Sequence, residues 1–387
     1  MKFNKWTLGL AAVGAVSLAS AVRADEAPKM SQLQTALSNT TISGYVDVAA
    51  QYNINHTAGG SQPPFASTPN GFSVNDVDIA IDKPEDDTPW ASGYHVDFQV
   101  GASPGTIYAS TVGFGAIRQA YIVLRTPVGN GIDWKFGAMD DIIGYEGNTD
   151  GANPNYTRSV GWFMEPASLL GMVGSYTINK MVTVQAGVAN ATSGPFSTDN
   201  KALVGSVAFT APDSWGFIKG ATLNLGTVLN FEKFGQQNYY AGVTIPTPMS
   251  ALKVGAAFDL ISVANDQPNF GPFGNTGDDS GYVIGLYGNY QATDKLSLNL
   301  RGEFYDLEGA VNPLNTDTIF AGEPNGIGEE ITATVQYNLW ANVISRLEFR
   351  WDHSDTGDAF GNPGAPESSS TAQGDSFILA LNLIYQF

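Results

Sequence analysis

Apolar and polar side chains alternate along most of the chain with a period of two residues. The C-terminal segment 377–387 is the clearest case. Successive side chains of a strand point to opposite faces, so this period predicts β-structure, and helical periodicity is nearly absent. One face of the segment would carry an unbroken apolar row that ends in an aromatic residue: Phe377, Leu379, Leu381, Leu383, Tyr385 and Phe387.

Charged residues in three further segments, 295–306, 330–339 and 342–353, also fall on one face, apart from Asp306 at the end of the first. Within the first of them, Arg301 and Glu303 alternate with Leu300 and Phe304. A soluble β-sandwich and a membrane barrel both place one strand face in water, so alternation alone leaves the two architectures open. The lengths of the connections must decide between them.

The connections between strands alternate between tight and long. Tight ones fall at 179–180, 248–250, 292–294 and 340–341, and long ones rich in Gly, Pro, Asn and Asp fall at 53–71, 102–116, 139–167, 262–280, 307–328 and 354–374. Short turns on one rim and long loops on the other are typical of bacterial outer-membrane barrels. The sequence therefore predicts an all-β fold, a transmembrane antiparallel β-barrel of about sixteen strands spanning residues 41–387, with fourteen or eighteen strands as alternatives. We expect strands centred near Val46, Val77, Val96, Ile122, Trp134, Ser175, Val184, Val207, Leu225, Gly242, Gly255, Leu286, Leu300, Val335, Phe349 and Leu381.

The N-terminus has the features of a secretory signal. Lys2 and Lys5 precede an apolar run over 6–22, and small residues lead to a cleavage site after Ala24. We therefore expect residues 1–24 to be a signal peptide and residues 25–40 to be a short periplasmic segment. No later stretch approaches eighteen consecutive apolar residues, so a closed barrel is the expected way of crossing the membrane.

Composition and charge exclude several classes of partner and site. Removal of residues 1–24 makes the net charge three units more negative than the −19 of the whole chain, because Lys2, Lys5 and Arg23 are lost. An acidic chain is repelled by nucleic acid, which we exclude as a partner. The absence of Cys excludes disulfides, thiolate metal sites and a lipoprotein anchor.

Candidate catalytic and metal-binding residues are few. His56, His95 and His353 are scattered too widely to predict a metal cluster or a catalytic triad, so no enzyme activity, cofactor or metal is assigned. The acidic runs 275–279 and 352–358 offer the oxygen ligands that Ca²⁺ takes, although such runs are more often solvated loops.

Three segments carry a resemblance to a known family: Ile42-Ser43-Gly44-Tyr45-Val46-Asp47, Phe72-Ser73-Val74-Asn75-Asp76-Val77, and the stretch from Gly144-Tyr145-Glu146 to Asn153-Pro154-Asn155-Tyr156-Thr157-Arg158-Ser159. Together they resemble the OmpL-like β-barrel porin family over essentially all of 41–387. The resemblance implies a Gram-negative outer-membrane location, contact with outer-membrane lipid, and passive diffusion. The terminal Tyr385-Gln386-Phe387 also resembles the signal that the outer-membrane assembly machinery reads.

The connection 139–167 is the expected pore constriction. In general porins the third long loop folds inward, and the same position here suggests the same arrangement. An Arg facing lipid costs roughly 2–4 kcal/mol at mid-depth, which favours inward wall arginines. An ordinary surface loop, or arginines that simply pair with Glu303 and Glu348, are the alternatives. The pore-constriction candidates are Asp140, Asp141 and Glu146 on the loop, and Lys135, Arg301, Arg346 and Arg350 on the wall.

The expected function is a water-filled channel for small hydrophilic solutes and ions, with a modest cation preference that comes from the acidic loops. A solute-specific channel, for instance for sugars, and a structural or adhesive barrel are the rivals. The sequence leaves open whether the barrel forms a homotrimer.

Overall fold

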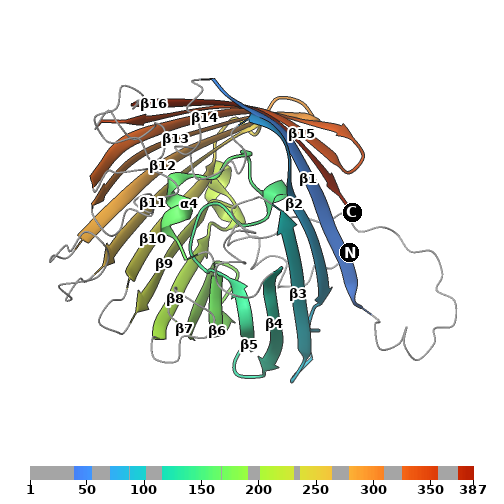
Figure 1. Ribbon diagram of the computed structural model, residues 1–387. Helices are drawn as coiled ribbons and strands as arrows, with labels where there is room; N and C mark the ends of the chain where they lie inside the picture. The colour runs from blue at the N-terminus through green and yellow to red at the C-terminus, as the bar shows by residue number, and fades with distance from the viewer. Residues whose placement is uncertain are drawn as a thin grey trace, which may run out of the picture.

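The computed structural model describes residues 39–54, 70–86, 88–101, 116–166, 168–190, 201–230, 236–263, 279–308, 325–355 and 374–387. The predicted signal peptide lies outside them, as does nearly all of 25–40. The described residues form one barrel of sixteen strands (Figure 1): β1 (Thr41–Asn53), β2 (Asn70–Lys83), β3 (Ser92–Gly101), β4 (Ile117–Thr126), β5 (Ile132–Asp140), β6 (Ser168–Thr177), β7 (Val182–Asn190), β8 (Lys201–Thr210), β9 (Thr222–Asn230), β10 (Gln236–Pro246), β11 (Leu252–Val263), β12 (Asp279–Gln291), β13 (Leu296–Glu308), β14 (Asn325–Trp340), β15 (Val343–Ser354) and β16 (Asp375–Gln386).

The barrel is closed and antiparallel throughout. Each strand pairs with its neighbours in sequence, and β1 pairs with β16 from Tyr45 opposite Gln386 to Asn53 opposite Ile378. Closure leaves no unpaired strand edge, which the membrane interior requires. The prediction of sixteen strands is confirmed, and each predicted centre lies inside an observed strand. On the rim of short turns, one connection is longer than expected and contains the 3₁₀ segment η2 (Asp213–Ile218).

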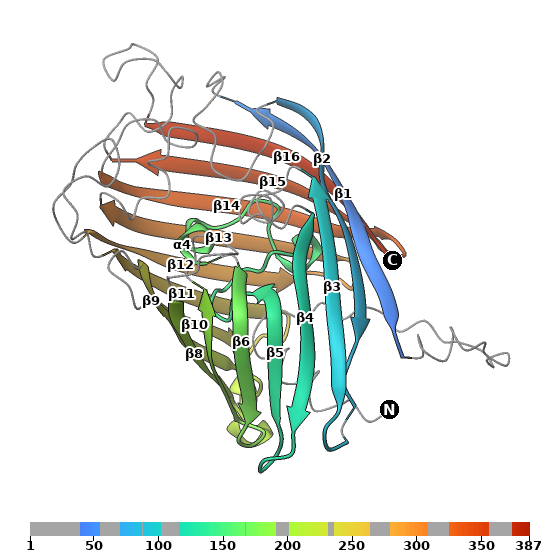
Figure 2. The same ribbon diagram turned by 60° about the horizontal axis from the view of Figure 1, so that its bottom comes forward.

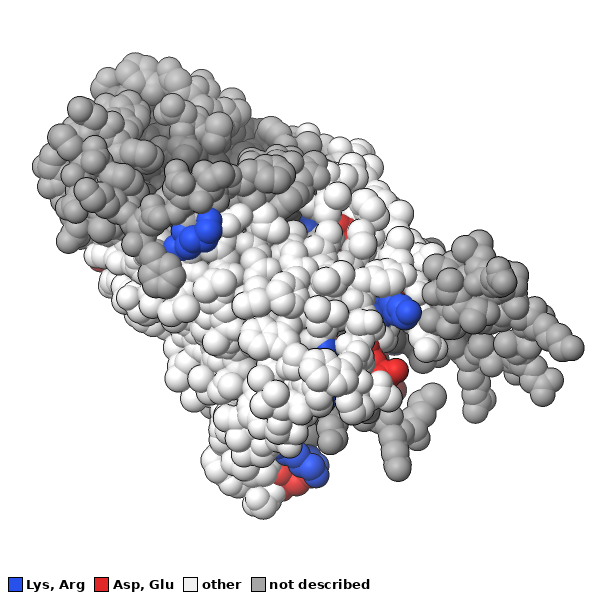
Figure 3. All heavy atoms as spheres, turned by 90° about the horizontal axis from the view of Figure 1, so that it is seen from below, with Lys and Arg blue, Asp and Glu red and all other residues white. Residues whose placement is uncertain are grey.

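The outward face is apolar. Leu225, Leu286, Leu300 and Leu381 expose between 46% and 61% of their surface, although each lies in the middle of a paired strand. On the face in Figure 3, charged side chains are few and leave a broad uncharged stretch of wall. An exposed apolar band of this extent matches the hydrocarbon layer that surrounds outer-membrane barrels. No described helix is both long enough and apolar enough to cross a membrane.

The inward face has two sectors. From β6 to β12 it consists mostly of small and apolar side chains, which form a buried cluster that includes Leu169, Val173, Ala189, Ala202, Val204 and Val228. From β13 through β16 and β1 to β5 it is strongly charged, with buried residues that include Arg301, Glu330, Glu348, Arg350, Asp47, Asp76 and Asp97. This division determines how the segment between β5 and β6 packs.

Candidate functional site: the lumen loop and the charged wall

The segment 141–166, which we call the lumen loop, lies inside the ring of strands. Figures 1 and 2 both show it, with its short helix α4 (Val160–Met164), surrounded by the wall. Ser159 caps α4, since its hydroxyl accepts from the Trp162 backbone N–H at 3.0 Å. Every residue from Asn153 to Glu165 is buried or half-buried. The loop is therefore a folded part of the barrel interior.

The first part of the loop packs on the apolar sector. Ile143 lies over Gly226 of β9, and Tyr145 lies over Gly255 of β11. The Tyr145 ring stacks on Tyr287 of β12 with a centroid distance of 3.9 Å, and its hydroxyl lies 3.1 Å from the hydroxyl of Thr244. Glycines in the wall leave the space that these two loop side chains fill. Apolar burial thus holds this end of the loop.

The middle of the loop binds the charged sector through Arg301. The Arg301 guanidinium on β13 donates to Glu146 at 2.7 Å, and to both carboxylate oxygens of Glu330 on β14 at 3.1 Å. All three side chains are fully excluded from solvent. A buried charge must be paired, so this triad fixes the loop against β13 and β14.

Wall carboxylates also bind the loop backbone. Glu303 accepts from the N–H groups of Val160 and Gly161 at 2.7 and 3.0 Å, at the start of α4. Glu348 on β15 accepts from the N–H groups of Tyr156 and Thr157 at 2.5 and 2.9 Å. These bonds satisfy buried loop amides that would otherwise lack partners.

The remaining wall arginines bind loop carbonyls. Arg346 donates to the carbonyls of Asp150 and Asn153 at 3.1 and 2.5 Å, and Arg350 donates to the carbonyl of Arg158 at 2.6 Å. Both side chains are at most 1% exposed. Arg301, Arg346 and Arg350 therefore face the loop itself rather than open water, and they lie on the same side of the lumen as Glu146.

Arg158 joins parts of the lumen loop to one another, and it was not among the candidate site residues predicted from the sequence. It is buried, pairs with Asp150 at 2.5 Å, and donates to the Asn148 carbonyl at 3.0 Å. Arg158 lies in a connection between strands, where the inward and outward alternation of a strand does not apply, so the sequence did not indicate which way its side chain points. An Arg among carboxylates in a long aromatic loop is the signal that was available.

Two loop carboxyls are held in an environment that disfavours charge. Burial raises the pKa of Asp141 well above its usual range, and the nearby Asp140 and Asp259 act in the same direction. Burial, then Asp259 and Asp141, raise the pKa of Glu165 in the same way. A carboxyl that is buried beside other carboxyls rather than beside a cation ordinarily favours its protonated, neutral form. Asp141 thus differs from Glu146, which has Arg301.

The wall from β2 to β5 carries a second set of charges. Arg118 on β4 contacts Asp97 on β3 and Asp140 at the end of β5, the latter at 2.5 Å. The Asp140 side chain is 28% exposed and also accepts from Asn148 at 3.0 Å. Lys135 lies with its ammonium 4.5 Å from the centre of the Tyr121 ring. Asp140 and Lys135 are therefore placed on a different wall from the predicted arginines.

Charged pairs continue along this wall toward the rim of short turns. His95 lies 3.1 Å from Asp82, whose side chain is 41% exposed. Near the rim, Arg125 lies 3.0 Å from Asp133 and 3.8 Å from Glu85. Exposed carboxylates inside the barrel are found here, whereas the charges of β13 to β15 that bind the lumen loop are enclosed.

Comparison with known proteins agrees with this architecture. The sequence matches the family model described as "Putative beta-barrel porin-2, OmpL-like" over residues 39–387. Among the curated proteins, no match to the sequence was found. Similar solved structures include OmpT of Vibrio cholerae in its trimer form (TM-score 0.59, 13% identity, covering 90% of this chain and 99% of that one). The outer membrane channel DcaP of Acinetobacter baumannii is also similar (TM-score 0.57, 12% identity, covering 90% of this chain and 97% of that one). So is an anion-selective porin from Comamonas acidovorans (TM-score 0.56, 12% identity, covering 90% of this chain and 99% of that one). At these identities the likeness shows the fold alone.

Proposed function

Because the chain belongs to the OmpL-like family of β-barrel porins, we propose that it forms an outer-membrane channel for passive diffusion of small hydrophilic solutes and ions. The fold and the family favour a channel over an enzyme. A barrel of this size encloses more space than its wall side chains can fill. The lumen loop occupies part of that space, so the course of the loop determines where a channel can run.

The observation that carries the proposal is the unequal exposure of charges on the two sides of the lumen. Against β13 to β15, the wall arginines are bound to the loop and have at most 1% of their surface exposed. Along β2 to β5, Asp82 and Asp140 keep 41% and 28% of their side-chain surface exposed. We place the diffusion path along the inner face of β3 to β5 and of the part of β2 near the short turns, opposite the β13 to β15 wall. The loop reaches the other part of β2, where the Tyr156 hydroxyl donates to Asn75 at 3.3 Å.

We also propose a modest cation preference. Carboxylates outnumber cations on the proposed path, with Asp82, Asp97, Asp133 and Asp140 against Arg118, Arg125 and Lys135. A pore wall with an excess of one sign attracts the opposite ion. Among the predicted constriction residues, Asp140 and Lys135 border this path. Glu146, Arg301, Arg346 and Arg350 act by holding the loop.

Conductance of the purified protein in planar bilayers tests the channel. We expect stable open steps whose size grows with salt concentration. Silence under all voltages would support a closed structural or adhesive barrel instead. Saturation of the current block by a single sugar would support a solute-specific channel.

Assembly and targeting complete the proposal. A similar OmpT structure is described as a trimer form, which supports a homotrimer in the membrane for this chain, testable by native mass spectrometry in detergent. The backbone of Phe387 pairs with Gly44 at 3.0 and 3.1 Å, and the residue is 51% exposed. An exposed terminal aromatic supports the proposal that Phe387 is read by the assembly machinery during insertion.

A further inference from the structure

Three side chains from neighbouring strands meet on the outward face near the rim of long loops. Glu329 of β14 is directly opposite His353 of β15, which is directly opposite Asp375 of β16. Asp355 follows one residue after the end of β15. Trp351 and Phe377 come next on the same face, so the group lies just beyond the aromatic end of the apolar band.

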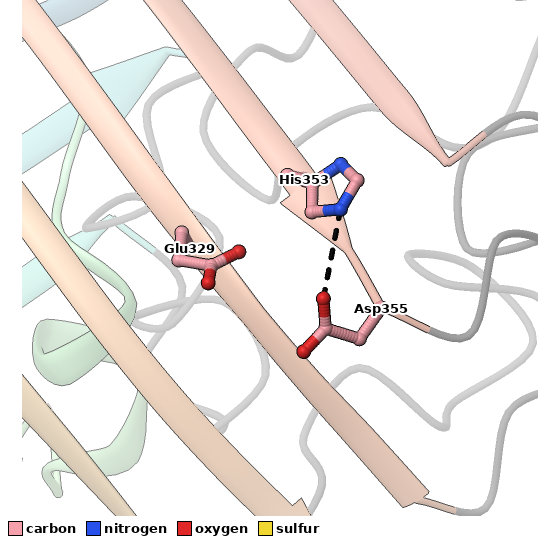
Figure 4. Close-up of side chains that lie close together, drawn as sticks. All are labelled: Glu329, His353 and Asp355. Carbon is pink, nitrogen blue, oxygen red and sulfur yellow. Dashed lines mark ion pairs between the residues drawn. The ribbon is translucent and has the colours of Figure 1, made fainter.

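The geometry of this group suits a metal ion. Glu329, His353 and Asp355 each offer one ligand atom, and these atoms lie within 4.8 Å of one another. In Figure 4 the two carboxylates flank the imidazole, and Nε2 of His353 lies 3.6 Å from Oδ1 of Asp355. Glu329 and His353 come from neighbouring strands that the barrel register aligns, and Asp355 follows directly after β15.

The fourth side chain orients the imidazole. Oδ1 of Asp375 lies 2.9 Å from Nδ1 of His353 and accepts from the Trp351 indole N–H at 2.8 Å. An ionised carboxylate only accepts hydrogen bonds, so Nδ1 of His353 carries a proton. In the neutral ring, Nε2 then presents its lone pair toward Asp355. A carboxylate that holds the distal nitrogen of a histidine is the usual outer-shell partner of a metal-binding imidazole.

We propose that Glu329, His353 and Asp355 bind a divalent transition-metal ion of the Zn²⁺ type, with Asp375 as a positioning residue. One imidazole and two carboxylates make up a ligand set that Zn²⁺ accepts, and water can complete the usual four-coordinate geometry. A calcium site would be built from oxygen ligands alone, and the imidazole argues against it. The site lies outside the lumen and does not depend on the proposed channel.

Isothermal titration calorimetry of the full-length barrel in detergent, after removal of metal with EDTA, tests the site. We expect one Zn²⁺ per chain for the wild type. His353→Ala and the near-isosteric Glu329→Gln should each weaken binding at least tenfold. His95→Ala, which removes an inward-facing histidine, is the matched control and should bind as the wild type does.

Asp375→Asn separates the positioning role from ligation. Loss of an outer-shell partner typically costs 10–100-fold in affinity while the ligands stay in place. The visible absorption of bound Co²⁺ should accordingly persist in Asp375→Asn at higher metal concentration, and disappear in His353→Ala. Zn²⁺ binding that survives both His353→Ala and Glu329→Gln would overturn the proposal. Binding of Ca²⁺ in preference to Zn²⁺ would overturn it as well.

Discussion

The guanidinium of Arg301 on β13 donates to Glu146 of the lumen loop at 2.7 Å, and neither side chain retains any exposed surface. Removal of one partner from a buried pair leaves an uncompensated charge and costs about 3–5 kcal/mol. We expect Arg301→Gln to loosen the loop, because Glu146 and Glu303 then lose their cation and Glu330 keeps only Arg350, at 3.9 Å. Limited proteolysis should cut within 141–166 faster than in the wild type, and single-channel currents should become larger or noisier.

Lys219→Gln is the control for that change, because Lys219 and Asp213 form an exposed pair at 2.8 Å on the short-turn rim. Exposed pairs contribute about 0–1 kcal/mol, so this variant should behave as the wild type does. A loop that stays protected in Arg301→Gln would show that the backbone bonds from Glu303 and Glu348 suffice.

The glycines beneath the loop give a second prediction. A methyl group at Gly255 would overlap the Tyr145 hydroxyl, and one at Gly226 would overlap a methyl of Ile143. Overpacking of this kind typically costs 1–3 kcal/mol. We expect Gly255→Ala and Gly226→Ala to displace the loop and to lower the temperature of unfolding. Gly288→Ala, where an added Cβ meets no atom within 4 Å, should leave that temperature unchanged, and a drop of equal size would contradict the packing argument.

The turn between β2 and β3 provides a test of pH dependence. Burial, then the neighbouring Asp133, raise the pKa of Glu85 to about 8. For an acid whose pKa is raised on folding, stability is full below the unfolded pKa, near 4.3, and declines as pH rises through the folded value. Between these limits the loss is at most about 1.4 kcal/mol for each pH unit. Glu85→Gln should therefore unfold at higher urea concentration than the wild type at pH 9, and at nearly equal concentration at pH 5. Equal midpoints at both pH values would indicate that Glu85 ionises normally.

The strands could be predicted from the sequence because membrane barrels put lipid on one face and polar groups on the other. Leu300 and Arg301 illustrate this, since a shift of one residue would expose the Arg side chain to lipid. The contact of Arg301 with Glu146 could not be predicted, because the two residues are far apart in sequence. The alternation along a strand shows that a side chain faces the lumen. It does not show whether that side chain meets water or a folded segment there.

The cluster around His353 escaped prediction for a related reason. Three scattered histidines gave no spacing motif, and Glu329 is brought opposite His353 by strand register alone. The acidic run 352–358 was considered for Ca²⁺, and it contributes Asp355 to the proposed metal site. Cross-strand neighbours become visible only when the number of residues in each turn is known.

Ion preference gives the last prediction, and it separates two adjacent carboxyls that the sequence treats alike. Asp140 is partly exposed beside Arg118, whereas burial raises the pKa of Asp141 well above its usual range and favours its neutral form. Asp140→Asn therefore removes a charge from the proposed path, and Arg118 keeps only its wall partners, Asp97 and Asp78.

We expect Asp140→Asn to reduce the cation preference, and Asp141→Asn to change it little, in reversal potentials across a KCl gradient. Asp213→Asn, which removes an exposed charge from η2 on the short-turn rim, is the matched control and should have a small effect. The preference of the wild type should fade as salt rises, since the Debye length is about 8 Å at physiological ionic strength and about 3 Å at 1 M. A larger effect for Asp141→Asn than for Asp140→Asn would place the ion path on the other side of the loop. An anion-selective wild type would show that Arg118 and Lys135 dominate the field.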